Sequence, residues 1–249
     1  MMQSYWEDRL RNNLNLRGTG HRAFGLAYNN WLYRAQSDCM DVIAARADVT
    51  FNGCTVLDVG SGTGYFVEYF MQQGAAHITG LDITQASVAY LRQAYPEHTF
   101  QVADIAEPNV NLAQQFDIVS IISVLYHIVD DAGFAQAVAN LCDQVKPGGY
   151  LFLSDTFQQP FLPTARHARF RTLEEYRELL TEGGMAIVEV LPIYYFLNQT
   201  FVPLLGPRLI DLFQLGKPLY QLDTWLRKRQ VQNGAGMKLL LARKTESLY

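Results

Sequence analysis

Short apolar runs alternate with amphipathic segments from residue 54 to residue 190, and this alternation limits the fold more than any other feature of the chain. Buried parallel strands are continuous apolar runs, and successive parallel strands need a crossover between them, usually helical. The sequence therefore predicts an α/β fold of βαβ units around a parallel sheet. We expect strands over 54–59, 78–83, 99–103, 116–124, 150–154, 185–190 and 237–242, with helices over 65–73, 85–95, 132–145 and 172–182.

End signals support several of these helices. Thr84 is placed to cap the helix that Pro96 stops, and Thr172 with Glu175 three residues later forms the pattern of a capping box. Residues 146–149, Lys-Pro-Gly-Gly, predict a turn that ends the helix before them.

Two aromatic segments lie outside the alternation, at residues 1–50 and 194–235. We expect the first to form a helical lid over a domain at 51–249, and the second to be an insertion before the last strand. Aromatic residues at this spacing are typical of core or dimer contacts. Both segments are also suited to cover the carboxyl edge of the sheet, where open α/β folds bind ligands.

Composition excludes several classes of protein. The 249 residues are 49% hydrophobic, enough for one large core, and carry 20 Lys and Arg against 24 Asp and Glu, unlike a broadly basic nucleic-acid binder. Residues 201–249 hold eight Lys and Arg against three acids, a modest excess typical of a solvated face. Three scattered cysteines argue against disulfides or structural zinc. With no leader-like or membrane-spanning run, we expect a soluble cytoplasmic monomer or homodimer without nucleic-acid or membrane partners.

The sharpest motif is Val-Leu-Asp-Val-Gly-Ser-Gly-Thr-Gly at 56–64, between a predicted strand and a predicted helix. Glycines let the backbone turn tightly and approach a ligand closely. The spacing is G-x-G-x-G, and Tyr65 stands where the dinucleotide fingerprint needs its third glycine, which disfavours a nicotinamide oxidoreductase.

Acidic residues follow the next two predicted strands. Asp82 is placed to accept hydrogen bonds from ribose hydroxyls, and Asp104 to accept one from an adenine amino group. Ile83 and Ile105 are placed to flank the adenine ring. A single acid after a strand is usually a loop or capping residue, but glycine loop and acids together describe an adenosine without a pyrophosphate.

With these residues the chain resembles the class I S-adenosylmethionine-dependent methyltransferases. The resemblance covers about 54–190 and is carried by VLDVGSGTG at 56–64, GLDI at 80–83, VADIAE at 102–107, FDIVSIISVLYHIVDD at 116–131 and KPGGYLFLSD at 146–155. It implies a seven-stranded sheet of order 3-2-1-4-5-7-6 whose seventh strand is antiparallel. It also implies S-adenosyl-L-methionine as cofactor, with S-adenosyl-L-homocysteine as product.

The resemblance assigns the same ribose and adenine roles to Asp82 and Asp104, and gives the methionine part of the cofactor to the loop with Gly60, Ser61, Gly62 and Gly64. Asp58 is similar to the family's acid beneath that loop, which orders it or reaches the cofactor amine. We also assign Ser123 to the cofactor site. Arg34, with Tyr28 and Tyr33, is placed to reach the cofactor carboxylate, although a solvated Arg34 is the simpler interpretation.

Two histidines are candidate general bases for a hydroxyl acceptor, which must lose a proton near the transition state. His127 directly follows the fourth predicted strand, and the alternative is a histidine packed at the sheet edge. His167 lies among Arg166, Arg169 and Arg171, a run suited to grip an anionic acceptor but also typical of a solvated helix entry. Tyr126 is a candidate for the pocket wall.

We therefore predict methyl transfer to a small molecule, most plausibly at oxygen. Carbon or nitrogen methylation and cofactor binding without turnover remain as alternatives. The fourth strand ends in Ser-Val-Leu-Tyr at 123–126, in place of the Asn/Asp-Pro-Pro-Tyr that the resemblance asks of enzymes methylating amino groups on nucleobases or glutamine. Asp130, Asp131 and Asp155 form no recognisable metal-site pattern, so we expect no metal.

Overall fold

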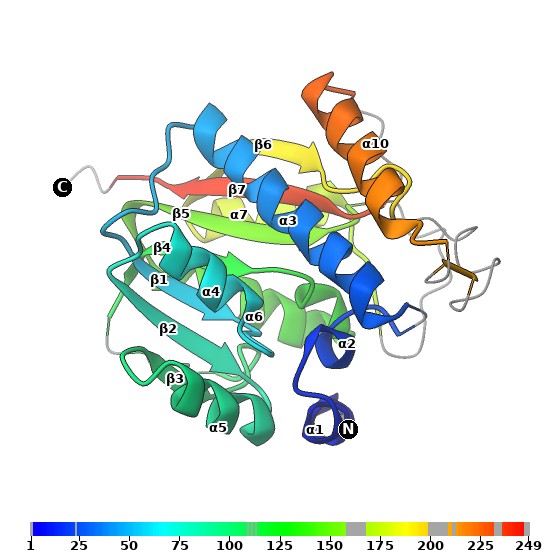
Figure 1. Ribbon diagram of the computed structural model, residues 1–249. Coiled ribbons are helices and arrows are strands. Elements are labelled where there is room, and N and C mark those ends of the chain that lie inside the picture. Colours follow the sequence, from blue (N-terminus) through cyan, green and yellow to red (C-terminus); the bar gives the residue numbers. More distant parts are fainter. Residues whose placement is uncertain are drawn as a thin grey trace.

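A computed structural model of the chain describes residues 2–22, 24–108, 110, 112, 114–157, 168–198, 209–210, 213–231 and 236–246. It contains one seven-stranded sheet of order β3-β2-β1-β4-β5-β7-β6 (Figure 1). The strands are β1 (Thr55–Val59), β2 (His77–Asp82), β3 (Thr99–Val102), β4 (Phe116–Ile121), β5 (Val145–Asp155), β6 (Met185–Pro192) and β7 (Lys238–Lys244). Strand β7 pairs antiparallel with both β5 and β6, while β3, β2, β1, β4 and β5 pair parallel. The predicted order and the antiparallel seventh strand are confirmed.

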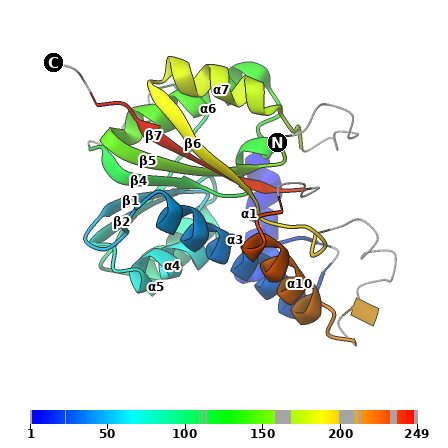
Figure 2. The same ribbon diagram turned by 90° about the horizontal axis from the view of Figure 1, so that it is seen from above.

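Helices cover both faces of the sheet, as Figure 2 shows from above. The described helices are α1 (Met2–Asn12), α2 (Leu16–Thr19), α3 (Leu26–Arg46), α4 (Tyr65–Gln72), α5 (Gln85–Ala94), α6 (Asp131–Gln144), α7 (Leu173–Glu182) and α10 (Gly216–Lys228), with a short 3₁₀ turn η1 (Leu125–His127). Helices α3, α4, α5 and α10 lie on one side, and α6 and α7 lie on the other.

The alternation of side chains along each strand builds two hydrophobic clusters, one on each face. Val56 and Ile118 face the α3–α4 side, while their neighbours Leu57 and Val119 face the α6–α7 side. Both faces are covered, so apolar residues occupy both sets of alternating positions in these central strands. The predicted capping box at Thr172 and Glu175 is present at the start of α7, and Thr84 caps α5.

Two predicted boundaries are wrong. Strand β4 ends at Ile121, and Ser123 adopts a left-handed backbone (φ 62°) whose N–H bonds the Ser154 side chain 2.8 Å away instead of continuing the ladder. The predicted turn at 146–149 belongs to β5, whose pairing with β4 shifts register across this stretch. The Pro-Gly-Gly sequence at 147–149 indicates a turn, but it cannot show that these residues already belong to β5.

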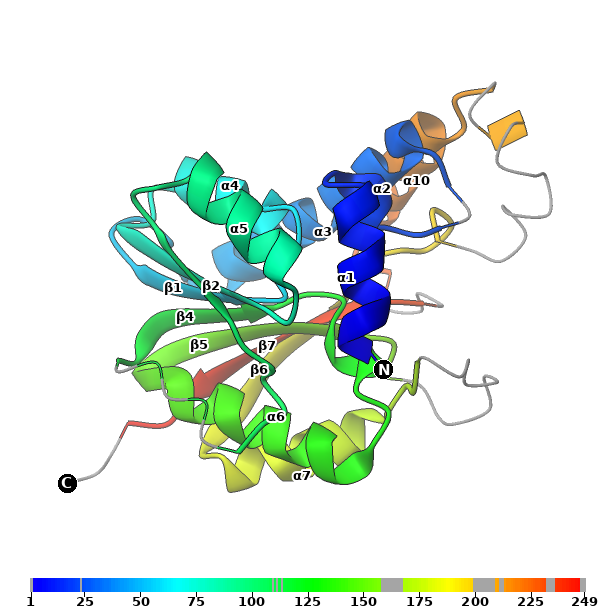
Figure 3. The ribbon, with the colours of Figure 1, turned by 90° about the horizontal axis from the view of Figure 1, so that it is seen from below.

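Helix α1 crosses the edge of the sheet where the parallel strands end, as Figure 3 shows from below. Helix α3 runs along the sheet on the β6–β7 side, and α10 packs beside it (Figures 1 and 3). Residues 2–22 thus lie over the carboxyl ends of the strands, while α10, which falls within the segment predicted as an insertion, lies farther out.

Asp223 fastens α10 to the chain that leaves β6. Its buried carboxylate accepts hydrogen bonds from the backbone N–H groups of Tyr195, Phe196 and Leu197 at 3.0, 2.8 and 3.1 Å. On the same helix, Arg227 donates to the carbonyl of Ile193 at 2.7 Å. These bonds hold α10 in one position against the sheet edge.

Replacing Asp223 by alanine should lower the free energy of unfolding by about 2–4 kcal/mol, because three N–H groups lose their acceptor in or near the protein interior. Urea denaturation measures this change. Gln221→Ala, at an exposed position of the same helix, is the control and should stay within about 0.5 kcal/mol of the parent. Equal stabilities of the two variants would show that the Asp223 bonds contribute nothing.

Candidate functional site

The glycine loop between β1 and α4 is pressed against two other segments. The N–H groups of Gly60 and Ser61 both donate to the carbonyl of Leu81, at 2.7 and 3.0 Å, which ties the loop to β2. Gly60 has φ 77°, and a Cβ added there would stand 2.4 Å from Val124 Cγ2. A Cβ at Gly62 would stand 2.7 Å from Thr19 Cγ2. These positions therefore require glycine for both conformation and space.

Asp82 joins the loop to the start of α5. One carboxylate oxygen accepts the N–H of Gly62 at 2.8 Å, and the other accepts the N–H and hydroxyl of Thr84 at 2.9 and 2.7 Å. The residue is only 7% exposed, and burial raises the pKa of its carboxyl despite these bonds. Asp82 thus fixes the loop and also borders the cavity described below.

Asp58 lies beneath the loop and is 2% exposed. Its Oδ2 atom has no hydrogen-bond partner within the described part of the chain. Burial, reinforced by the nearby Asp82 charge, raises the pKa of Asp58 to about 7. A buried carboxyl oxygen without a partner, below a glycine loop, is a ready acceptor for a cationic group of a ligand.

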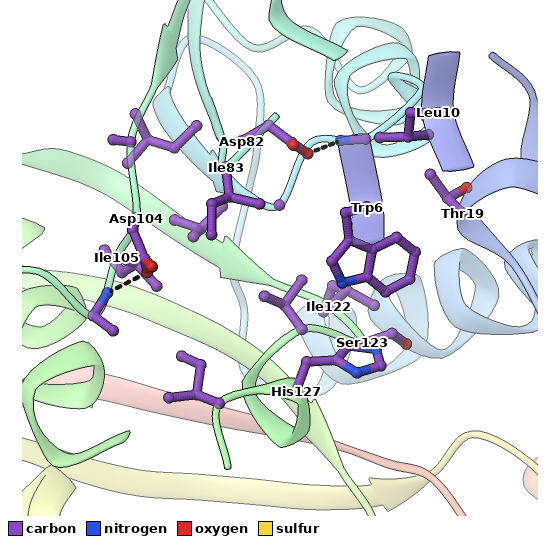
Figure 4. A pocket seen from close by; sticks show the side chains of 18 of the residues that line it. Trp6, Leu10, Thr19, Asp82, Ile83, Asp104, Ile105, Ile122, Ser123 and His127 are labelled. Atoms are coloured by element: carbon purple, nitrogen blue, oxygen red, sulfur yellow. Dashed lines mark hydrogen bonds between the residues drawn. The ribbon is translucent and has the colours of Figure 1, made fainter. Parts of the chain in front are cut away.

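A cavity of about 300 Å³ opens at the carboxyl ends of β1, β2, β3 and β4 (Figure 4). Its wall is largely apolar. Of the residues predicted for the site, those that line it are Tyr33, Gly60, Gly62, Asp82, Ile83, Asp104, Ile105, Ser123 and His127. The structure therefore brings most of the predicted set to one place.

Asp104 and the two isoleucines form one end of this cavity. Asp104 accepts the N–H of Ala106 at 2.9 Å, which orients its carboxylate, and the residue is partly exposed. Ile83 and Ile105 lie close to it in Figure 4. An acceptor oxygen beside apolar side chains suits a flat heterocycle that carries an amino group.

His127 borders the cavity from η1, at the other end. Its ring meets Trp6 edge-on with centroids 5.1 Å apart, and it packs against Tyr126 at 4.4 Å. In Figure 4 the side chains of Trp6 and His127 lie next to each other, near Ser123. His127 is thus both packed at the sheet edge and part of the cavity wall.

Several predicted residues lie away from the cavity. The Tyr28 hydroxyl donates to the carbonyl of Leu197 at 2.7 Å, in the contact between α3 and the chain after β6. Arg34 stands over the ring of Tyr220. Asp58, Ser61, Gly64 and Tyr126 are not among the residues that line the cavity. Arg166 and His167 lie outside the described residues.

The arginines after β5 make internal contacts. Arg169 pairs with Asp131 at 2.9 Å, and its backbone N–H donates to the carbonyl of Tyr126 at 2.7 Å. Arg171 is 2% exposed, covers the ring of Phe134 at 3.7 Å, and donates to the carbonyl of Ile128 at 3.0 Å. Both arginines therefore brace the loop that carries His127.

Residues 1–50 were expected to cover the edge of the sheet, but the individual side chains that α1 and α2 contribute were not predicted. Trp6, Leu10 and Thr19 line the cavity. The Glu7 carboxylate accepts the N–H groups of Gln85 and Ala86 at 2.7 and 3.4 Å, which docks α1 on the N-terminus of α5. The spacing of Trp6 and Leu10, four residues apart on one helix face, is the signal that points to them.

A buried polar group also escaped prediction. Gln36 of α3 donates to the Tyr194 hydroxyl at 2.7 Å and lies 3.4 Å from the Ser123 hydroxyl. Its Oε1 has no partner within the described residues, although Gln36 is only 7% exposed. Ser123 belongs to the cavity wall, so this group adjoins the cavity behind β4.

Comparison with known proteins identifies the family. A methyltransferase domain family matches residues 56–149, from β1 into β5. A ubiquinone biosynthesis O-methyltransferase of Neisseria meningitidis serogroup C is 28% identical over 188 residues, covering 65% of this chain and 76% of that protein. A protein of the same name from Serratia proteamaculans is 35% identical over 127 residues, covering 49% and 51%.

The fold agrees. Magnesium protoporphyrin IX methyltransferase of Synechocystis PCC 6803, solved with bound S-adenosylhomocysteine, superposes with a TM-score of 0.61 at 17% identity, over 98% of this chain and 97% of that one. The chain belongs to the class I S-adenosylmethionine-dependent methyltransferases. It is thus an enzyme whose methyl donor is S-adenosylmethionine.

The described residues fit that cofactor. The glycine loop offers space that any Cβ would fill, Asp58 has a free carboxyl oxygen, and Asp104 borders an apolar slot. Among the described residues, no three His, Cys, Asp or Glu side chains gather as metal ligands. No described helix is long and apolar enough to cross a membrane.

Gly60→Ala should weaken binding of S-adenosylhomocysteine at least about tenfold, because the new methyl group displaces Val124 into the cavity. Gly53→Ala is a matched control: Gly53 has φ 76° against 77° at Gly60, yet nothing lies within 4 Å of its added Cβ. Both variants should lose about 1–2 kcal/mol of stability from the left-handed backbone. Isothermal titration calorimetry separates them, and equal affinities would contradict the steric account.

Proposed function

We propose that the enzyme methylates a hydroxyl or carboxyl oxygen of a small molecule. The observation that carries this proposal is the position of His127 in the wall of the same cavity as Asp82 and Asp104. A base there lies beside the space left for an acceptor. The names of the Neisseria and Serratia relatives, both O-methyltransferases, support the choice of oxygen.

The cofactor would be held by residues from four strand ends. We assign the ribose hydroxyls to Asp82, whose Oδ2 atom keeps a lone pair beyond the one that Gly62 uses, while Thr84 occupies the Oδ1 atom. Asp104 would accept the adenine amino group between Ile83 and Ile105, and the loop at 60–64 with Asp58 would take the methionine part. Bound there, the cofactor supplies a methyl group on a sulfonium, which is an excellent leaving group.

Little covalent work remains for the protein. Its tasks are to hold the acceptor in line with the methyl group, to exclude water, and to take the acceptor's proton. We assign the last task to a ring nitrogen of His127, which would receive the hydroxyl proton as the new oxygen–carbon bond forms. Trp6 packs against the ring and keeps it oriented.

We assign polar groups of the acceptor to the pair Gln36 and Ser123. The Oε1 atom of Gln36, which has no partner among the described residues, can accept a hydrogen bond from the acceptor molecule. The hydrogen bond from Gln36 Nε2 to the Tyr194 hydroxyl already fixes the orientation of the amide. A buried amide held in this way favours an acceptor with a second polar substituent over a purely apolar one.

Residues 1–50 would act as the lid of this site. Helix α1 contributes Trp6 and Leu10 to the wall and is held on α5 by two backbone bonds to Glu7. Gln3 adds a bond to the carbonyl of Ile83 at 3.0 Å. Breaking these bonds would let α1 open to admit cofactor and acceptor.

The direct test incubates the enzyme with S-adenosylmethionine and a panel of phenols, hydroxybenzoates and aliphatic carboxylic acids, and detects methylated products by mass spectrometry. Transfer to oxygen in any of them supports the proposal. Transfer only to amines or activated carbons would replace it with N- or C-methylation. Binding of S-adenosylhomocysteine without turnover of any acceptor would favour a protein that uses the cofactor as a ligand.

Affinity for S-adenosylhomocysteine should depend on pH through Asp58. Its pKa of about 7 lies above the ordinary 3.8, so the carboxyl is mostly protonated below pH 7 and cannot pair with the cofactor ammonium. The affinity should therefore fall about tenfold per pH unit below 7 and level off above it. Calorimetry from pH 5.5 to 8 should show this in the parent and not in Asp58→Asn. An unchanged profile in the variant would remove Asp58 from the amine site.

His127→Ala should lower kcat for a hydroxyl acceptor about a hundredfold or more, because the acceptor proton loses its base. Affinity for S-adenosylhomocysteine should change little. His77→Ala is the control, since His77 lies at the end of β2 opposite Asp82, and its ring is hydrogen-bonded to the Thr99 hydroxyl at 3.0 Å. If kcat of His127→Ala fell less than about threefold, His127 would not be the base, and its role would be limited to packing.

A further inference from the structure

Helix α10 presents an outward face that neither the sheet nor the cavity uses. On a helical wheel its buried residues, Gly216, Asp223 and Arg227, fall on one side. The opposite side is centred on Trp225 and is exposed. Its members are Lys217, Pro218, Gln221, Leu222, Trp225, Lys228 and Arg229.

Large apolar side chains gather on this outward face and just before it. Phe213 is 66% exposed, Trp225 51%, Leu209 46% and Leu222 40%, which include the two largest exposures of apolar side chains in the described structure. Isolated exposed leucines are common, but Leu222 and Trp225 on one helix face, with Leu209 and Phe213 shortly before the helix in the chain, mark an interaction surface.

The charge of the outward face has one sign. Lys217, Lys228 and Arg229 are exposed, and Arg229 lies 4.8 Å from the centre of the Trp225 ring. Within the described residues 209–210 and 213–231, Asp223 is the only acidic residue, and it is buried against the chain that follows β6. Residues 1–200 carry the opposite balance, 12 Lys and Arg against 21 Asp and Glu. The outward face thus places three basic side chains beside its aromatic and aliphatic ones, in a chain that is acidic as a whole.

The helix is held firmly behind this face. Tyr220 bonds Asp38 of α3, Gly216 lies against Trp31, and Asp223 and Arg227 fix the chain after β6. The outward residues make no comparable bonds to the rest of the described chain. A rigid support that carries Trp and Leu between Lys and Arg matches helices lying in the headgroup layer of a membrane.

We propose that the outward face of α10 docks the enzyme onto a lipid surface with anionic headgroups. The indole and the leucine would enter the boundary of the acyl chains, and the basic side chains would contact the headgroups. A second copy of the chain fits less well, because a twofold contact through this face would bring like charges together. This mode of binding is peripheral, needs no spanning helix, and does not depend on the identity of the acceptor.

The test is co-sedimentation of the full chain with vesicles of phosphatidylcholine, with or without phosphatidylglycerol. We expect binding to the phosphatidylglycerol vesicles alone, weakened by added salt. Lys228→Glu with Arg229→Glu should lower the binding constant at least about tenfold, since each basic residue near an anionic surface contributes roughly a factor of five. Trp225→Ala should lower it severalfold.

Two exposed residues elsewhere supply matched controls. Arg177→Glu on α7 reverses a half-exposed charge, and Val188→Ala on β6 truncates a side chain that is 47% exposed. Both should bind vesicles like the parent. Affinity for S-adenosylhomocysteine, measured in every variant, verifies the fold and separates this surface from the cofactor site.

Absence of sedimentation with phosphatidylglycerol vesicles would overturn the proposal, as would binding that the α10 variants leave unchanged. Gel filtration and an RNA mobility shift identify the rival occupants. A dimer that Trp225→Ala converts to a monomer, without vesicle binding, would assign the face to a second copy. An RNA complex lost in the charge-reversal variant, again without vesicle binding, would assign it to nucleic acid.

Discussion

The Asp82 carboxylate is the interaction on which the site depends. Parallel pairing of β1 and β2 brings the end of β2 beside the glycine loop, and Asp82 then bonds Gly62 on one side and Thr84 on the other. One side chain thus fixes both the loop and the start of α5. Helix α1 docks on that same start through Glu7, so the position of α1 follows from the position of Asp82.

The sequence was sufficient for the framework because the framework is local. An apolar run in the sequence marks each buried strand. Thr84 caps α5, and Thr172 with Glu175 caps α7, at the positions that the sequence predicts. The same locality explains the two wrong boundaries. Ser123 leaves the ladder for a bond to Ser154, a residue on the neighbouring strand that no pattern within β4 can reveal.

The wall of the cavity was only half predictable for a related reason. Gly60, Asp82 and Asp104 follow their strands directly, so the order of strands is enough to bring them together. Trp6 and Gln36 reach the site through helices whose docking depends on contacts more than 75 residues away in sequence, such as Glu7 with Gln85 and Gln36 with Ser123. The spacing of Trp6 and Leu10 marks a shared helix face but does not show what that face packs against, and Gln36 carries no local signal.

Two buried carboxyl groups, those of Asp58 and Asp155, lower the stability of the fold at neutral pH. Burial raises the pKa of Asp58 to about 7 and that of Asp155 to about 6, against an ordinary 3.8. The folded chain therefore holds more protons than the unfolded chain between about pH 4 and these values, and stability falls as the pH rises through that window. The Tyr176 hydroxyl donates a hydrogen bond to Asp155 at 2.6 Å, which offsets part of the destabilisation caused by burying that carboxylate. The Oδ2 atom of Asp58 has no such partner in the described chain. A fold selected for stability alone would satisfy or replace Asp58. A cationic ligand that paired with Asp58 beneath the glycine loop, as we propose for the cofactor amine, would stabilise the folded chain against the unfolded one.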